Sequence, residues 1–247
     1  MTKPCTKLLF LLASAVLVFA VPANATTIFE YSGSGDPTAQ GWSEGVGAGG
    51  GTSAGPVGGE SAWFVEDSST AGASTLTYGQ NPTAGNNVDA ATNGWSLTTR
   101  LKMITGTVGI HNSIFTDYID GSTQWVMDFD VAPDGDPVVY LGFGAGRPSF
   151  EVDGGAGQYH TYSLVFDPIA GSADLFVDGI ERISDHGGIA AAASRVAWGA
   201  GASNATGRAN FESVTFDINA AEIPEPGALA IYGLGLVGLG FARRRTR

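Results

Sequence analysis

The fold is decided by residues 159–179, which read YHTYSLVFDPIAGSADLFVDG. From His160 to Phe166 every second residue is apolar or aromatic, which is the period of a β-strand with one face turned toward a core. Asp167-Pro168 begins a turn, and a second short apolar run follows it. Asp178-Gly179 then supplies the pair of residues that a tight two-residue β-hairpin favours. The stretch therefore predicts successive antiparallel strands.

The same alternation recurs outward along the chain, whereas no helical periodicity persists anywhere. The strands it predicts are Trp95–Met103, Trp125–Val131 and Val214–Ile218, with shorter ones at Thr27–Tyr31, Ala62–Val65, Thr75–Tyr78, Val138–Phe143 and Val196–Trp198. Gly, Pro, Asn and Asp separate them. Ser32–Glu60, rich in Gly, Ser and Pro, is expected to be one long irregular loop. About twelve short strands with polar turns predict an all-β protein, an antiparallel sandwich or jelly roll.

Residues 159–179 also resemble the laminin-G/concanavalin A-like lectin and glucanase superfamily. The shared pattern is an aromatic-His strand ending in Asp, followed by a strand that ends Leu-Phe-Val-Asp-Gly. Phe211–Phe216 resembles the last strand of that fold. The resemblance implies a carbohydrate-related β-sandwich over residues 26–222, and an unrelated all-β sandwich is the alternative.

The N-terminus reads as a secretory signal peptide covering residues 1–25. A short basic start precedes an apolar run from Leu8 to Val21, which is too short for a usual membrane span. Ala23-Asn24-Ala25 is a small-x-small cleavage site, so the mature chain is expected to begin at Thr26. An N-terminal membrane anchor is the alternative.

The C-terminus, residues 223–247, contains three parts in a fixed order. Pro224-Glu225-Pro226 comes first, an uncharged apolar stretch runs from Gly227 to Ala242, and Arg243-Arg244-Arg245 follows it. As a helix the apolar stretch would be about 24 Å long, slightly shorter than a hydrocarbon core of about 30 Å. We expect one transmembrane helix whose arginines stay on the cytoplasmic side.

This ordered trio resembles the PEP-CTERM sorting domain of Gram-negative bacteria. The resemblance implies recognition by an exosortase, removal of the tail, and export in bacteria that make exopolysaccharide. The chain would then contact the inner membrane at least transiently. A plain C-terminal membrane anchor is the alternative.

Charge and cysteine content exclude several function classes. Between residues 26 and 242 the chain has six basic and 24 acidic residues, which argues against nucleic-acid binding. The one cysteine, Cys5, lies in the predicted signal peptide, so neither an intramolecular disulfide nor a cysteine-rich zinc site is expected.

Catalysis has weak support in the sequence. A glycan hydrolase needs two carboxylates flanking the sugar bond, and residues i and i+2 of a strand would present them together. Glu151 with Asp153, and Asp128 with Asp130, have this spacing, but neither pair continues into a full glucanase pattern. We expect such pairs to be solvated strand faces, and we expect the three histidines to have no catalytic or metal role.

Calcium is the one metal that the sequence suggests. Asp134 and Asp136 follow Asp128 and Asp130 and gather oxygen ligands at a strand end, as hard cations prefer. A solvated acidic turn is the alternative, and no other cofactor is expected.

The sequence thus predicts a non-catalytic protein of the cell surface or exopolysaccharide matrix, as in a biofilm. Its β-sandwich would be structural, adhesive or glycan-binding, with extracellular polysaccharide as a partner. A polysaccharide hydrolase or lyase on the same fold is the second hypothesis.

Overall fold

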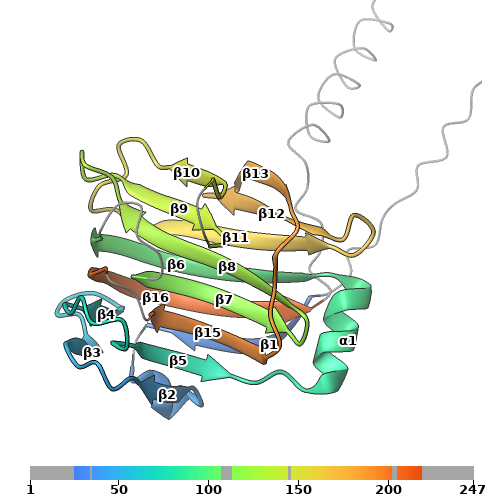
Figure 1. Cartoon of the computed structure of the whole chain (residues 1–247), viewed down its shortest axis with the longest axis horizontal. Helices are drawn as coiled ribbons and strands as arrows, with labels where there is room; N and C mark the ends of the chain where they lie inside the picture. The colour runs from blue at the N-terminus through green and yellow to red at the C-terminus, as the bar shows by residue number, and fades with distance from the viewer. Residues whose placement is uncertain (1–24, 34, 107–112, 144–145, 202–204, 219–247) are drawn as a thin grey trace, which may run out of the picture.

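The chain forms a sandwich of two antiparallel β-sheets. The computed structural model describes residues 25–33, 35–106, 113–143, 146–201 and 205–218. Within them the two sheets lie one in front of the other (Figure 1). The all-β antiparallel prediction is confirmed, although the described residues contain more strands than the sequence predicts.

Each sheet has eight strands. Sheet A runs in the order β13 (Ile180–His186), β12 (Ser172–Val177), β11 (His160–Asp167), β6 (Trp95–Thr105), β16 (Gly207–Ile218), β4 (Trp63–Asp67) and β3 (Thr52–Pro56), with β1 (Thr26–Ser32) also paired to β16. Sheet B runs in the order β10 (Ser149–Glu151), β9 (Pro137–Leu141), β8 (Thr123–Val131), β7 (Ile114–Asp120), β15 (Ser194–Ala200), β5 (Leu76–Gln80) and β2 (Ser43–Val46), with β14 (Ile189–Ala190) paired to β8.

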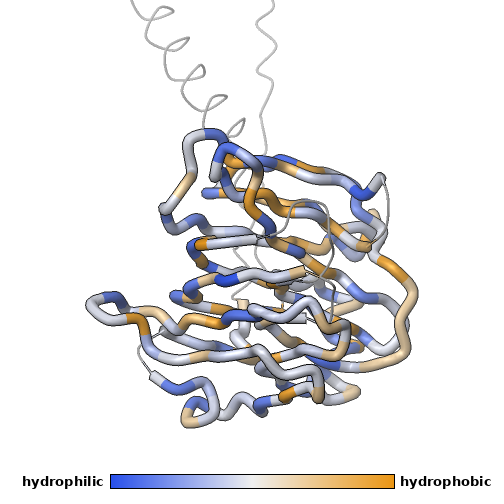
Figure 2. Tube along the Cα trace, turned by 60° about the vertical axis from the view of Figure 1, so that its left-hand side comes forward, coloured by the Kyte–Doolittle hydropathy of each residue, from blue (hydrophilic) through white to orange (hydrophobic). Residues whose placement is uncertain are grey.

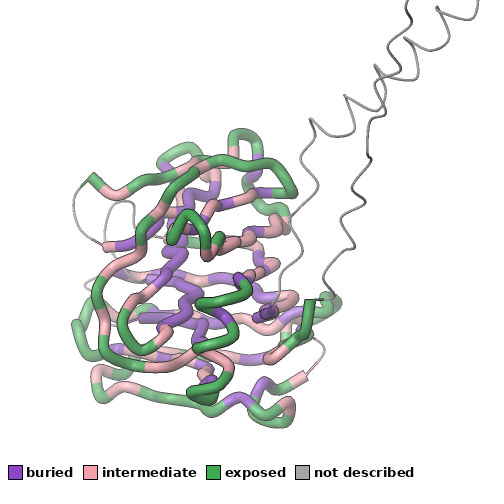
Figure 3. The backbone as a smooth tube through the Cα atoms, turned by 90° about the vertical axis from the view of Figure 1, so that its right-hand side faces the viewer, coloured by how far each residue is buried: buried purple, intermediate pink, exposed green. Residues whose placement is uncertain are grey.

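The core lies between the sheets and is built from the alternating residues. Hydrophobic and hydrophilic residues alternate along the strands in Figure 2, and the buried positions line the space between the layers in Figure 3. Trp95 and Trp125, both predicted to be core, are buried, and the Trp95 ring stacks on Phe166 with centroids 5.5 Å apart. Each such side chain contributes about 1.5–3 kcal/mol when fully buried.

The predicted hairpin between β12 and β13 is confirmed. Asp178 and Gly179 both have positive φ, 51° and 77°. This is the combination that a type I′ turn requires, and it matches the right-handed twist of the flanking strands.

The prediction of one long loop over Ser32–Glu60 is wrong. This stretch contains the 3-10 helix η1 (Pro37–Gln40) and the strands β2 and β3. Both strands lie at sheet edges, and β2 is exposed at every position. An edge strand that buries no side chains is held by backbone hydrogen bonds to its one neighbour. Its sequence therefore needs no alternation of apolar residues, and no period-two signal appears there.

One α-helix, α1 (Ala84–Asn93), also escaped prediction. Thr83 caps it, and the Thr83 hydroxyl and Asn86 side chain form a reciprocal capping box. Only Ala90 is buried, so the helix lacks the apolar stripe that sequence periodicity detects.

Several predicted segments lie outside the described residues: most of the signal peptide including Ala23, the apolar stretch Gly227–Ala242, and the sorting residues Pro224, Glu225, Pro226, Arg243, Arg244 and Arg245. Ala25 is described, is exposed, and directly precedes β1. Among the described residues, no helix has the length and apolar character needed to cross a membrane.

Candidate functional site

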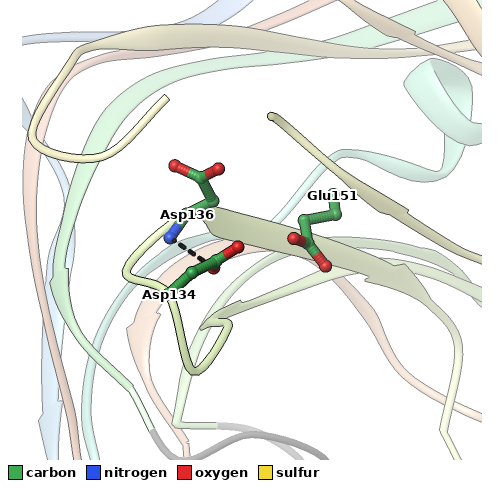
Figure 4. A group of neighbouring side chains, drawn as sticks. All are labelled: Asp134, Asp136 and Glu151. Atoms are coloured by element: carbon green, nitrogen blue, oxygen red, sulfur yellow. Dashed lines mark hydrogen bonds between the residues drawn. The ribbon is translucent and has the colours of Figure 1, made fainter. Parts of the chain in front are cut away.

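The two aspartates predicted to bind calcium lie together, and a glutamate joins them. Asp134 and Asp136 are in the β8–β9 connection, and Glu151 ends β10 (Figure 4). One carboxylate oxygen of each lies within 4.8 Å of the others. Sequence reasoning did not place Glu151 beside the aspartates because their contact depends on the pairing of β9 with β10.

Internal hydrogen bonds already occupy part of this acidic cluster. The Asp136 carboxylate accepts from the backbone amides of Gly154 (2.7 Å) and Ala156 (3.0 Å), and Asp134 accepts from the Asp136 amide (3.2 Å). Slight desolvation and the negative charges of Asp134 and Asp153 raise the pKa of Glu151. Three exposed or half-exposed carboxylates suit a hard cation. Calcium binding at Asp134 and Asp136 stays a prediction.

The expectation that Asp128 and Asp130 form a solvated strand face is wrong, because both are fully buried. Asp128 pairs with Arg147, whose guanidinium lies 3.8 Å from the centre of the Tyr140 ring. Asp130 accepts a hydrogen bond from Ser113 (3.1 Å). These carboxylates are held by internal partners.

A second apolar cluster lies on the outer face of sheet B, the face that Asp128 and Asp130 share by strand alternation. Phe115, Val126 and Ala197 lie on that face, and Phe143 and Ile189 pack against them. Part of this face is therefore buried, whereas the outer face of a two-layer sandwich is usually solvated.

The other predicted carboxylate pair, Glu151 and Asp153, does not share a strand. Strand β10 ends at Glu151, and Asp153 lies in the turn beyond it. The strand geometry that would present both side chains on one face is therefore absent at this point of the described chain.

The outer face of sheet A carries a denser group of polar side chains, which we name the Tyr159 patch. Its members come from β6, from β16 and from the connections that precede β4 and β11; they are Glu60, Arg100, Lys102, Tyr159, Asn210 and Glu212. Lys102 on β6 lies opposite Asn210 on β16. Neighbouring strands thus bring together residues that are far apart in sequence.

Two ion pairs organise the Tyr159 patch. Lys102 Nζ lies 2.7 Å from Glu60 Oε1, and Arg100 Nε lies 2.6 Å from Glu212 Oε2. Tyr159 donates its hydroxyl hydrogen to Glu60. Both cations also approach the tyrosine ring, with Lys102 Nζ 4.8 Å and Arg100 Cζ 5.6 Å from its centre.

The backbone explains how the two glutamates reach the patch. Glu212 sits in a bulge of β16, because Phe211 lies opposite Leu101 and Ser213 opposite Arg100. A bulge re-aims a side chain in this way. Glu60 directly precedes a close crossing of the chain at Gly33, where an added Cβ would lie 2.5 Å from the Ser61 carbonyl oxygen.

Charge states within the patch follow from its contacts. The Lys102 ammonium and the Tyr159 hydroxyl lower the pKa of Glu60, which is a carboxylate at neutral pH. Burial and the adjacent Glu60 charge raise the pKa of Tyr159, which is a neutral phenol. Asn210 is buried, and its Oδ1 has no hydrogen-bond partner within the described part of the chain. The patch is thus electrically balanced and rich in hydrogen-bonding groups.

Part of the Tyr159 patch had a signal in the sequence. Arg100 and Lys102 are two residues apart on the strand face opposite to Leu101 and Met103, so their outward direction follows from the alternation. Tyr159 belongs to the quoted motif, but nothing local marks its role. Glu60 and Glu212 depend on a loop crossing and a bulge, which period-two reasoning does not detect.

Comparisons with known proteins match two overlapping segments of the chain. Residues 222–245 match the PEP-CTERM protein-sorting motif, which marks an exported, cell-surface-associated protein of Gram-negative bacteria. Residues 75–232, more than half of the chain, match the family described as the Vibrio cholerae sialidase lectin insertion.

Two curated relatives are similar over most of the body. They are the sialidases of Vibrio cholerae serotype O1, strains Classical Ogawa 395 and El Tor Inaba N16961, each 29% identical over 214 residues. The match covers 83% of this chain and 26% of each sialidase, so the chain spans about a quarter of the length of these relatives.

A solved structure shares the fold. The carbohydrate esterase vb_24B_21 from the Shiga toxin-encoding bacteriophage phi24B aligns with a TM-score of 0.53 at 14% identity, covering 80% of this chain and all of that one. These matches support a lectin-like β-sandwich, but not specifically the concanavalin A or laminin-G type that the sequence motif suggests. The chain belongs to the family of the Vibrio cholerae sialidase lectin insertion.

Proposed function

We propose that this chain is a non-catalytic exported protein whose β-sandwich binds glycans of the cell surface or exopolysaccharide matrix through the Tyr159 patch. Family membership supports a carbohydrate ligand, because the matching family is described as a lectin insertion. The sorting motif supports delivery to the cell surface, with exosortase as the processing partner and the inner membrane as a transient location.

The Tyr159 patch is the observation that carries the glycan-binding proposal. Glycan sites combine an aromatic side chain with a few fixed polar groups. Here a half-buried tyrosine lies beside two ion pairs, and the side chains of Arg100 and Glu212 are each 40% exposed. The exposed Arg100–Glu212 pair offers both donors and acceptors to sugar hydroxyls, and Tyr159 offers an apolar ring.

A pair of variants tests the assignment. Tyr159→Ala should lower retention of the protein on immobilised polysaccharide by about tenfold, which corresponds to about 1.4 kcal/mol. Phe150→Ala is the matched control: Phe150 is a half-buried aromatic of the other sheet, on β10. Equal retention of both variants and the wild type would argue against the patch as the binding site.

A polysaccharide-acting hydrolase is the second candidate, and one observation favours it. Asp134, Asp136 and Glu151 bring carboxylate oxygens within 4.8 Å of one another, slightly less than the separation of about 5–5.5 Å between the two acids of a retaining glycosidase. The Asp136 carboxylate, however, already accepts two backbone amides. Hydrolysis by the wild type that disappears in Glu151→Gln would replace our proposal with this one.

A further inference from the structure

Each lysine and arginine between residues 26 and 242 has an acidic or aromatic partner, which disfavours an acidic ligand. Six such residues lie between residues 26 and 242, and all six are in the described part of the chain. Five form ion pairs: Arg100 with Glu212, Lys102 with Glu60, Arg147 with Asp128, Arg195 with Asp117, and Arg208 with Glu66. The sixth, Arg182, has its guanidinium 4.5 Å from the centre of the Phe150 ring.

From this inventory, and resting on the proposed glycan-binding function, we infer that the ligand is an uncharged, hydroxyl-rich glycan and that carboxylate-bearing glycans are rejected. A carboxylate that approaches Arg100 or Lys102 would also meet the negative charge of Glu212 or Glu60.

Hydrogen-bonding chemistry distinguishes the two ligand classes at the Arg100–Glu212 pair. A sugar hydroxyl both donates and accepts, so one hydroxyl can accept from Arg100 while another donates to Glu212 without breaking the ion pair. An ionised carboxylate only accepts, so it gains from the arginine and is repelled by the glutamate. The paired arrangement favours the neutral ligand.

Two further features of the molecule agree with this inference. Outward-facing hydroxyls continue the surface next to the patch, where Thr98 on β6 donates to Ser163 on β11 (3.0 Å) and Arg100 donates to Thr161 (3.4 Å). The body also has 24 acidic against six basic residues between positions 26 and 242, and a field of that sign slows the approach of a polyanion.

The test compares polymers that differ in charge on one backbone: dextran against carboxymethyl dextran, and hydroxyethyl cellulose against carboxymethyl cellulose. The full chain is used, with Arg243→Ser, Arg244→Ser, Arg245→Ser and Arg247→Ser so that the cationic tail cannot hold polyanions. We expect retention on at least one neutral polymer about tenfold stronger than on its charged partner. Retention should change less than about twofold between roughly 50 and 500 mM salt.

The controls separate this inference from the proposed function. Tyr159→Ala should lose retention on the neutral polymer, whereas Arg182→Ala, outside the patch, should keep it. Stronger, salt-sensitive retention on the carboxymethyl polymers would overturn the inference and leave glycan binding in place. Retention on neither class would overturn both.

Discussion

Thr26, the first residue of β1, lies directly opposite Ile218, the last residue of β16. The predicted signal peptide and the sorting tail therefore join the body at the same end of the sandwich. Asn210, in the same strand as Ile218, lies roughly 25 Å away at the usual rise per residue. A body held at its tail would thus keep the Tyr159 patch away from the point of attachment.

Processing of the tail should depend on the Pro-Glu-Pro motif. Replacing Pro224, Glu225 and Pro226 together by alanine should leave a longer form in the membrane fraction, because the sorting motif would be lost. Mass spectrometry of both termini in the native host measures this, with Asn219→Ala as a control outside the matched segment. Unchanged size and release of the triple variant would contradict exosortase processing.

Removing the exposed Arg100–Glu212 pair should weaken glycan binding but leave folding stability almost unchanged. Exposed ion pairs contribute less than about 1 kcal/mol to folding, so Glu212→Ala should change the free energy of unfolding by no more than that. Its retention on glycan should nevertheless fall by about tenfold. Parallel denaturant titration and affinity electrophoresis give both quantities, and a loss of stability without loss of binding would show a purely structural pair.

The buried Arg147–Asp128 pair should behave in the opposite way. The Arg147 side chain is 5% exposed and Asp128 is fully buried, so Arg147→Ala would leave a buried carboxylate without its charged partner. We expect a loss of about 3–5 kcal/mol in the free energy of unfolding. Arg182→Ala, at a surface ring contact, should cost less than about 1 kcal/mol in the same titration. Equal costs would contradict the structural role.

Calcium should stabilise the body if the acidic cluster binds it. Millimolar calcium would then raise the melting temperature, because a ligand that binds only the folded state stabilises it by mass action. Glu151→Gln and Asp134→Asn should each reduce that rise, and magnesium at equal concentration controls for ionic strength. A melting curve that calcium leaves unmoved would exclude the site.

His186 should make stability depend on pH. Burial lowers the pKa of His186 below its ordinary value of 6.5, and the ring packs edge-on against Trp125 at 6.1 Å. Below about pH 6.5 the unfolded chain therefore binds a proton that the folded chain resists, so stability falls as pH falls. Thermal melts at pH 7.5 and 5.5 should show a smaller loss for His186→Phe than for the wild type; parallel losses would contradict this account.

The elements that could be predicted are those whose local residue pattern shows which positions are buried and which need an unusual backbone conformation. Trp95 and Leu97 alternate with polar residues because one face of β6 meets the core, and a single strand carries that signal. The turn signal of Asp178-Gly179 is also local, because positive φ at two successive residues limits which residue types can occupy them.

What escaped prediction depends on neighbours that are distant in sequence. The alternation within its own strand places Asp128 on the solvent face, yet Asp128 is buried and paired with Arg147. The Tyr159 patch likewise needs the pairing of β6 with β16 and the bulge at Glu212. Edge strands such as β2 carry no apolar pattern at all.

The most direct measurement is hydrogen–deuterium exchange of the full chain with and without a bound neutral polysaccharide. We expect slower exchange confined to the backbone around Arg100–Lys102, Tyr159–Thr161 and Asn210–Glu212, and no such slowing in Tyr159→Ala. Protection over the outer face of sheet B, or protection that persists in Tyr159→Ala, would contradict this expectation.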